Sequence, residues 1–317
     1  MIQAKDIHTV AIAGTGVMGA SMAQIFAKCG YEVILYGRHQ ASMEKGKKLI
    51  DLNQETQVTA GELTRADSEA LKARIRFSEP GDMTAFGQAD YVVECVTEDL
   101  SLKQAFWKDC SAAARPDAIL TTNTSGLSIT EIGKAVADPS RFAGMHWFNP
   151  PHIIPLIEVI RGEETAEETA DAVYELSELI GKKPVHVRKD APGFIANRIQ
   201  LAILREALHI KENGIGDFED VDRCMKYGLG FRYACLGPFE VIDFGGLDTF
   251  HHVASYLWED LANDTKPYGV FDQLYQDGCY GVKSGKGFYD YSGGKGDQAT
   301  KKRDEMYLKL FRAKVTD

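Results

Sequence analysis

The 317-residue sequence lacks the features that mark several classes of protein. It has no apolar run near the length needed to cross a bilayer, so a membrane-embedded fold is not expected. Its first residues, MIQAKDIHTV, lack a basic start followed by a long apolar segment, so we expect no export signal. No segment recurs with a period of roughly 20 to 50 residues, which argues against a repeat array.

Cysteine is sparse and positive charge is not in excess. The six cysteines form no CxxC pair and show no metal-ligand spacing, so we expect no metal site. They are typical of free thiols in a reducing compartment and predict a cytoplasmic protein. The formal net charge of −10 argues against nucleic acid or an anionic membrane as the main partner. A small molecule is therefore the expected ligand.

The first half of the sequence contains alternating strand-like and helix-like segments. Strands separated by helices predict βαβ units and a mostly parallel sheet. The β-rich runs are 8–14, 32–37, 74–79, 91–96, 118–125, 141–148, 156–162 and 184–189, and the helical patterns are 17–29, about 40–60, 64–73, 101–114, 128–137 and 165–180.

The second part of the sequence has a different pattern. Residues 193–214, 217–228 and 246–263 are typical of helices, and strand signals stop. Proline and glycine interrupt the chain at VRKDAPG, where we place a domain boundary. The predicted fold is an α/β, Rossmann-like domain with a mostly parallel sheet at residues 1–188, followed by an all-helical domain at residues 189–317.

A glycine-rich turn indicates the first ligand. The G-x-G-x-x-G pattern at Gly14, Gly16 and Gly19 follows an apolar strand and opens a helical stripe, which is the context of a dinucleotide-binding turn. Gly14 permits the tight turn, Gly16 lets a pyrophosphate approach the backbone, and Gly19 lets helix and strand pack closely. We therefore expect a nicotinamide dinucleotide here, with Val17 and Met18 among its contacts. The alternative is a glycine-rich turn without a ligand.

The residues after the second strand bear on the choice of dinucleotide. An NAD site normally carries an acid here that binds the adenosine ribose, but this chain has Gly37 followed by Arg38. Losing the carboxylate removes a ribose anchor and its repulsion of a 2′-phosphate, which a guanidinium can bind. We therefore expect NAD(P)H, with NADP(H) favoured over NAD(H). The alternative is a solvated surface arginine.

Two ionisable residues occupy apolar strand-like segments, His146 in AGMHWFNP and Glu158 in IPLIEVI. If they lie on neighbouring strands, the carboxylate can accept a hydrogen bond from one ring nitrogen and leave the other for a ligand. Such a histidine suits removal of a hydroxyl proton as hydride leaves the carbinol carbon. The alternative is a buried pair with a structural role only.

Polar side chains end the neighbouring strands, where ligands of open α/β sheets bind. Asn123, Thr124 and Ser125 end one predicted strand, and Asn149 follows His146. Ser125 and an amide could hold a developing oxyanion. This combination favours a proton-handling pair beside a nicotinamide over a purely structural one.

The order of several segments along nearly the whole chain resembles the L-3-hydroxyacyl-CoA dehydrogenase family. These segments are AGTGVMG, TNTSGLSITEI, RFAGMHWFNPP, LIEVI, DAPGFIANRI, LGPFEVIDFGGLDT and GVKSGKGFYDY. The resemblance implies that His146 is the general base, that Glu158 orients it, and that Ser125 and Asn197 contact substrate or nicotinamide.

The same resemblance implies further contacts and an assembly. Cofactor contacts are expected at Glu98, Lys103, Asn149 and Lys283. A homodimer through the helical domain is also expected. For comparison, Asn197 could simply cap its helix and Lys283 could be a solvated loop charge.

The sequence leaves the substrate open. Family members that bind coenzyme A usually carry a lysine-rich arm after the second strand, but after Lys48 residues 49–64 contain no lysine or arginine. Arg232, in FRYA, resembles the gulonate dehydrogenase and λ-crystallin branch and could clamp a free carboxylate, or form a structural ion pair.

We predict an oxidoreductase acting on a short L-3-hydroxyacyl-CoA such as 3-hydroxybutyryl-CoA. The alternative is the same chemistry on a small free hydroxy acid anchored by Arg232. A crystallin-like binding protein is disfavoured by the intact polar set, and a lyase or hydratase would leave the glycine turn unexplained.

Overall fold

The computed structural model describes residues 2–315. By its internal contacts the chain divides into two compact units, Met1–Asn197 with Tyr307–Asp317, and Arg198–Met306. The predicted boundary at residues 188 and 189 stays a prediction. No described helix is long and apolar enough to cross a membrane; the cytoplasmic location stays a prediction too.

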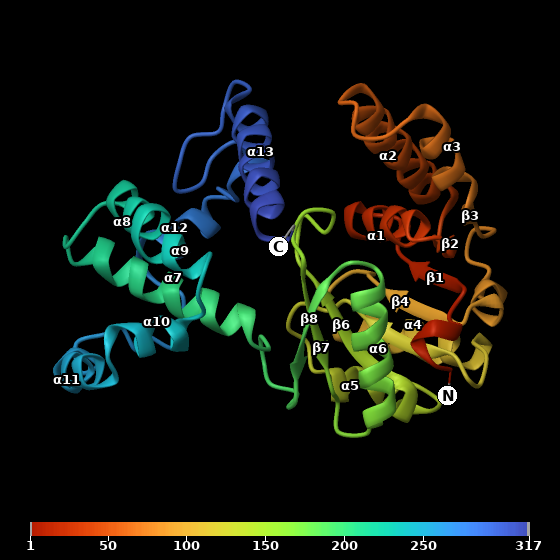
Figure 1. Cartoon of the computed structure of the whole chain (residues 1–317), viewed down its shortest axis with the longest axis horizontal. Helices are drawn as coiled ribbons and strands as arrows, with labels where there is room; N and C mark the ends of the chain where they lie inside the picture. Colours follow the sequence, from red (N-terminus) through yellow and green to blue (C-terminus); the bar gives the residue numbers. More distant parts are fainter. Residues whose placement is uncertain (1, 316–317) are drawn as a thin grey trace. The chain divides into compact units, whose positions relative to one another are not determined.

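The first unit is built on one eight-stranded sheet in the order β3-β2-β1-β4-β5-β6-β7-β8 (Figure 1). All neighbours are parallel except β6 and β7, which are antiparallel. The strands are β1 Thr9–Ala13, β2 Glu32–Tyr36, β3 Ile75–Phe77, β4 Tyr91–Glu94, β5 Ile119–Thr122, β6 Phe142–Trp147, β7 Leu156–Ile160 and β8 Lys183–Val187.

Helices separate most of these strands, as expected for parallel crossovers. Side-chain oxygens fix several helix starts: Thr64 accepts from the Asp67 N–H and Asp99 from the Leu102 N–H, which satisfies amides without a helical partner. The helices are α1 Val17–Lys28, α2 Gln40–Thr59, α3 Arg65–Ala73, α4 Leu100–Ala113, α5 Ile129–Gly133 and α6 Glu167–Leu179, with the 3₁₀ turns Ala4–Asp6, Met83–Gln88 and Pro139–Arg141.

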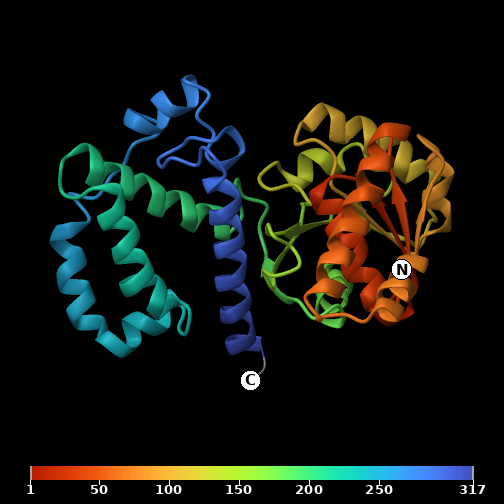
Figure 2. The same cartoon turned by 90° about the horizontal axis from the view of Figure 1, so that it is seen from above.

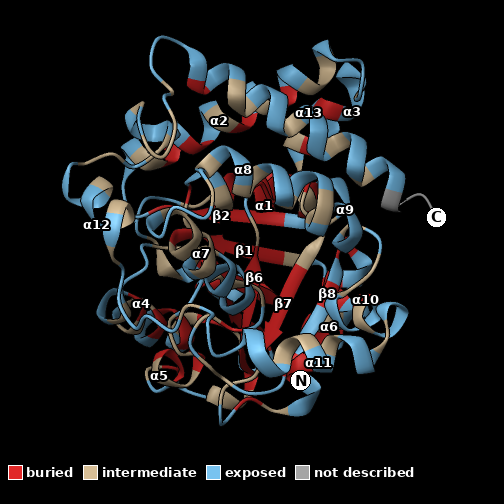
Figure 3. Ribbon diagram, turned by 90° about the vertical axis from the view of Figure 1, so that its left-hand side faces the viewer, coloured by how far each residue is buried: buried red, intermediate tan, exposed pale blue. Residues whose placement is uncertain are grey.

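The core lies on both faces of the sheet, because successive strand residues point to opposite sides. In β1, Val10 and Ile12 join one apolar cluster, and Ala11 and Ala13 join the other. Figure 3 shows the central strands in the colour of buried residues. A sheet covered on both faces leaves its carboxyl edge as the place for ligands.

Helices and loops make up the second unit (Figure 2). Its described residues contain no strand, only the isolated bridges of Lys286 with Gly281 and Asp290. Five described helices lie within it: α8 Phe218–Cys224, α9 Gly230–Tyr233, α10 Pro238–Gly245, α11 Leu247–Leu257 and α12 Gly269–Gln276, with a π-helical segment Met225–Leu229 and a 3₁₀ turn Val282–Ser284. Helix α7, Ala196–Glu212, begins in the first unit, and α13, Lys295–Val315, belongs to the first unit from Tyr307 on.

The predicted fold class, a mostly parallel α/β sheet followed by helices, is confirmed. Several details differ from the sequence prediction. The helix expected at 128–137 ends earlier, at Gly133, and the one expected at 246–263 ends at Leu257. Helices α9, α10, α12 and α13 were not predicted individually.

Candidate active site

His146 and Glu158 form a buried pair at the antiparallel step of the sheet. The β6–β7 register sets them directly opposite each other, and Nδ1 of His146 lies 2.8 Å from Oε2 of Glu158. His146 is 3% and Glu158 0% exposed, so solvent hardly reaches the pair. Because an ionised carboxylate only accepts hydrogen bonds, Nδ1 carries a proton, and in the neutral imidazole Nε2 is then the acceptor.

Glu158 is held in its charged form. Its Oε1 atom accepts from the backbone N–H groups of Ile195 at 2.9 Å and Ala196 at 2.8 Å, where α7 begins. Burial raises the pKa of the Glu158 carboxyl, but the hydrogen bonds from His146, Ala196 and Ile195 lower it by more, so its pKa lies below the usual value. The imidazole therefore faces a carboxylate at neutral pH.

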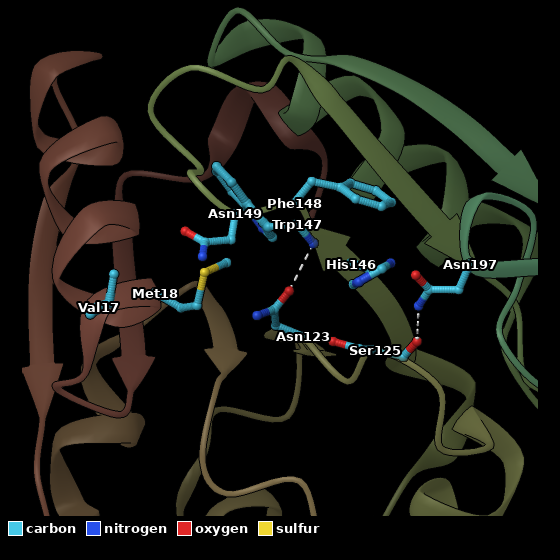
Figure 4. A pocket seen from close by; sticks show the side chains of 9 residues that line it. All are labelled: Val17, Met18, Asn123, Ser125, His146, Trp147, Phe148, Asn149 and Asn197. Atoms are coloured by element: carbon cyan, nitrogen blue, oxygen red, sulfur yellow. Dashed lines mark hydrogen bonds between the residues drawn. The ribbon is translucent and has the colours of Figure 1, made fainter. Parts of the chain in front are cut away.

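His146 opens into a pocket at the carboxyl edge of the sheet (Figure 4). Six of the lining residues were predicted from the sequence to be catalytic or cofactor-binding: Val17, Met18, Ser125, His146, Asn149 and Asn197. The full lining is Val17, Met18, Asn123, Ser125, His146, Trp147, Phe148, Asn149 and Asn197. The pocket thus joins the glycine-rich turn to the buried pair.

Two amides fix the floor of this pocket. The Asn197 side chain donates to the Ser125 carbonyl at 2.7 Å, and the Asn123 amide oxygen accepts from the Trp147 N–H at 2.7 Å (Figure 4). The second contact ties the end of β5 to the end of β6. The sequence marked Asn123 as a polar strand end but did not assign it this bracing role.

The aromatic side of the pocket was missed from the sequence. The Phe148 ring lies 4.4 Å from the His146 imidazole between centroids. Trp147 is 3% exposed and also lines the pocket. Their positions beside His146 in HWFNP are the one signal that could have pointed to them.

Glu98 and Lys103 contact each other but differ in burial, since Glu98 is exposed and Lys103 is buried. Glu98 accepts from the Thr124 hydroxyl at 2.6 Å and from the Ser125 N–H at 2.8 Å. Lys103 is fully buried, and its Nζ lies 2.5 Å from Glu94 Oε1 and 3.4 Å from Glu98 Oε2. Lys103 thus braces Glu98, and the predicted cofactor contacts of both residues stay predictions.

The glycine-rich turn has the packing that a dinucleotide site needs. A Cβ on Gly19 would lie 1.8 Å from the Gly14 carbonyl oxygen, and one on Gly14, whose φ is +120°, would lie 2.8 Å from the Cys95 carbonyl oxygen. Gly16 has open space around it at the N-terminus of α1. Close packing at two glycines and an open backbone at the third fit a pyrophosphate at the helix N-terminus.

The end of β2 leaves no space for a ribose-binding acid. A Cβ on Gly37 would lie 2.5 Å from Met43 Cγ and 3.0 Å from Thr15 Cγ2. The neighbouring Arg38 is exposed. The Met43 and Thr15 side chains therefore occupy the space that a side chain at position 37 would need, while the Arg38 side chain is exposed to solvent.

Two predicted site residues belong to the second unit. Arg232 is exposed on the short helix α9. Lys283 lies in the 3₁₀ turn Val282–Ser284, with its Nζ 5.1 Å from the centre of the Tyr280 ring. Their predicted contacts with substrate and cofactor stay predictions.

Comparison with known proteins identifies the family. Residues 9–191 match the family model described as "3-hydroxyacyl-CoA dehydrogenase, NAD binding domain", and residues 193–291 match "3-hydroxyacyl-CoA dehydrogenase, C-terminal domain". The chain belongs to the 3-hydroxyacyl-CoA dehydrogenase family. The predicted family and the predicted oxidoreductase class with a nicotinamide cofactor are thereby confirmed.

Individual relatives differ in substrate. The chain is 38% identical over 287 residues to a 5-formyl-3-hydroxy-2-methylpyridine 4-carboxylate 5-dehydrogenase of Mesorhizobium japonicum, covering 90% of this chain and 91% of the relative. A solved dehydrogenase for the same pyridine carboxylic acid, described as NAD⁺ dependent, has a TM-score of 0.88 and 34% identity, covering 97% and 98% of the two chains. An (S)-3-hydroxybutyryl-CoA dehydrogenase from Ralstonia eutropha has a TM-score of 0.75 and 34% identity, covering 90% and 100%.

Proposed function

We propose that this protein transfers a hydride between a nicotinamide dinucleotide and a carbinol or carbonyl carbon, with His146 as general base and acid. The nicotinamide ring, when bound, accepts or supplies the hydride. Nε2 of His146 takes the hydroxyl proton on oxidation and returns it on reduction. Glu158 stabilises the charged imidazole and fixes its tautomer. The observation that supports this role is the 2.8 Å contact between Nδ1 of His146 and the Glu158 carboxylate, whose ionised form is stabilised by two main-chain N–H donors.

We propose that the Ser125 hydroxyl and the Asn197 amide hold the substrate oxygen. Both line the pocket with His146. Glu98 holds the Ser125 N–H and Asn197 holds the Ser125 carbonyl, so this residue is fixed on both sides. Donors that are fixed before the reaction stabilise an oxyanion at little reorganisation cost.

We propose NADP(H) as the preferred cofactor. The filled space at Gly37 excludes the acid that would bind a ribose hydroxyl, and Arg38 supplies a cation at the next position. The NAD⁺ dependence stated for the similar pyridine carboxylate dehydrogenase makes the comparison of NADPH with NADH the necessary test.

For the substrate, we propose a small molecule with a free carboxylate, which reverses the preference drawn from the sequence. The similarity to the pyridine carboxylate dehydrogenase extends over nearly the whole of both chains. In addition, α2, α3 and their connection, residues 40–73, contain six acidic and five basic residues, a net charge of −1. Within this arm Arg65 pairs with Glu55, and Lys72 pairs with Asp51 and Glu69. An arm of this charge attracts coenzyme A phosphates weakly.

A short L-3-hydroxyacyl-CoA is the second candidate. It is favoured by the similarity to the 3-hydroxybutyryl-CoA dehydrogenase, all of whose chain is covered. Lys45, Lys47 and Lys48, at the start of α2, are the cations that would meet a coenzyme A phosphate.

The two candidates are separated by a substrate panel. NADPH and NADH oxidation is followed with acetoacetyl-CoA, with free 3-keto acids and with aromatic carboxylates that carry a formyl group. We expect turnover with a free carboxylate and little turnover with the thioester. Arg232→Met should then raise KM for the carboxylate about 10- to 100-fold, the loss expected for a charge-assisted hydrogen bond. Arg223→Met, at another exposed arginine of the second unit, is the matched control. Turnover with acetoacetyl-CoA alone would establish the second candidate instead.

We also propose that two copies associate through the helical unit. Large apolar side chains of that unit are exposed: Tyr227 76%, Phe239 84%, Phe244 81% and Trp258 75%. Monomers rarely expose so many large apolar groups without a partner. Light scattering after gel filtration tests this, and a monomer that persists at high protein concentration would contradict it.

A further inference from the structure

The segment that precedes α7 contains a backbone conformation that its sequence does not favour. Ala191, Pro192 and Gly193 are typical of a tight turn, and the Phe194 N–H donates to the Ala191 carbonyl at 2.9 Å. Gly193 has a φ of +76°, which glycine adopts without cost. Phe194 follows with a φ of +53°, and it is the one non-glycine residue with positive φ in the described chain. That conformation costs an L-residue about 1–2 kcal/mol.

The turn is fastened at both ends. Before it, Asp190 accepts from the Ser128 hydroxyl at 2.5 Å and the Thr130 N–H at 2.9 Å. After it, the N–H groups of Ile195 and Ala196 both reach one oxygen of Glu158. Successive N–H groups converge on one anion only where the preceding backbone turns sharply.

Phe194 itself contacts the other member of the pair. Its side chain is 2% exposed, and its ring centroid lies 5.7 Å from that of the His146 imidazole. One residue therefore directs two donors to Glu158 through its backbone and touches His146 through its ring.

We propose that Phe194 is a positioning residue for the pair: its left-handed backbone aims two main-chain donors at Glu158 while its ring holds the imidazole in place. This inference rests on the proposed role of His146 and Glu158. Packing of the buried aromatic ring against the His146 imidazole, which an aliphatic side chain does not reproduce, offsets the backbone cost. Since Oε1 is held by the main chain and Oε2 meets His146, the carboxylate cannot rotate without losing the two N–H donors.

The test compares Phe194→Gly with Phe194→Ala. Both variants lack the ring, but a positive φ is energetically unfavourable for alanine and not for glycine. We expect kcat/KM of the alanine variant to be about 5- to 30-fold below that of the glycine variant, which is the backbone cost of 1–2 kcal/mol expressed as a ratio. Phe194→Leu, which keeps most of the apolar volume, should fall on the alanine side, and it serves if the smaller variants fail to fold.

A pH profile separates positioning from mere stability. Without the Ile195 and Ala196 donors, burial is less opposed and the pKa of Glu158 rises. The acidic limb of kcat/KM should therefore move to higher pH in the alanine and leucine variants and stay near the wild-type position in the glycine variant. The matched pair Phe86→Gly and Phe86→Ala removes another fully buried ring and should leave the profile unmoved.

Equal kcat/KM for the two Phe194 variants, or an unmoved profile in the alanine and leucine variants, would overturn the inference. Its failure is distinguishable from that of the proposed function. If His146→Gln remains active, the proposed function fails. If His146→Gln and Glu158→Gln lose activity while the two Phe194 variants coincide, only the positioning role fails.

Discussion

Nδ1 of His146 lies 2.8 Å from Oε2 of Glu158, and the two residues are paired directly across the antiparallel strands β6 and β7. Every other neighbouring pair of strands in the sheet is parallel. The antiparallel step therefore brings together two residues only twelve positions apart, with no helical crossover between them.

Replacing the carboxylate should disable the imidazole rather than the fold. In Glu158→Gln the amide oxygen can still accept from Ile195 and Ala196, which turns the NH₂ group toward His146. Nδ1 must then become the acceptor, and the proton moves to Nε2, where it blocks base catalysis. We expect kcat to fall by roughly 10²- to 10⁴-fold, as for loss of a general base.

The control for this variant is Glu163→Gln, at an exposed glutamate. Steady-state kinetics and thermal melting are measured on both. A Glu158→Gln variant that melts like the wild type and keeps its kcat would show that the carboxylate does not act on the reaction.

Arg38→Ala tests the cofactor preference. If the guanidinium binds a 2′-phosphate, its removal should raise KM for NADPH about 10- to 100-fold and change KM for NADH little. Arg188→Ala, at another exposed arginine of the first unit, is the matched control. Equal effects of Arg38→Ala on both cofactors would mean that Arg38 does not touch a 2′-phosphate.

Lys182 gives the stability a characteristic pH dependence. Its ammonium is buried, donates to the carbonyls of Pro151 and Ile154, and lies 5.3 Å from the centre of the Trp147 ring. Burial lowers the pKa of Lys182 from 10.5 to about 8. Between these values the unfolded chain binds more protons than the folded one, so the folded state gains stability as pH rises.

Lys182→Met lacks this gain. We expect urea unfolding, followed by tryptophan fluorescence, to show that the free energy of unfolding of the wild type rises relative to that of the variant from pH 8 upward. The total rise should be about 3 kcal/mol once the pH exceeds 10.5. Parallel pH dependence of the two proteins would contradict a buried, charged Lys182.

Much of the fold was predictable because its signals are local. Alternating strands and helices and the glycine turn each leave a pattern in the sequence, and the family resemblance extends along nearly the whole chain. The opposition of His146 to Glu158 also follows from neighbouring strands, and the structure shows the contact.

The contacts that support the site residues could not be predicted from local sequence patterns. That Lys103 braces Glu98, or that Asn123 meets the Trp147 N–H, depends on side chains and backbone atoms brought together from separate segments. Positive φ at Phe194 runs against the local preference of the residue, so only its tertiary contacts account for it. Helices α10 and α12 were missed because each is only eight residues long, too short to show a clear helical period.

The most direct test of proton transfer by His146 is kcat of His146→Gln, with the dissociation constant for NADPH determined on the same preparation. Glutamine keeps a polar side chain but cannot accept and return a proton at neutral pH. We predict a fall in kcat of about 10²- to 10⁴-fold with cofactor binding unchanged. Near-wild-type turnover in a variant that binds cofactor normally would contradict the account.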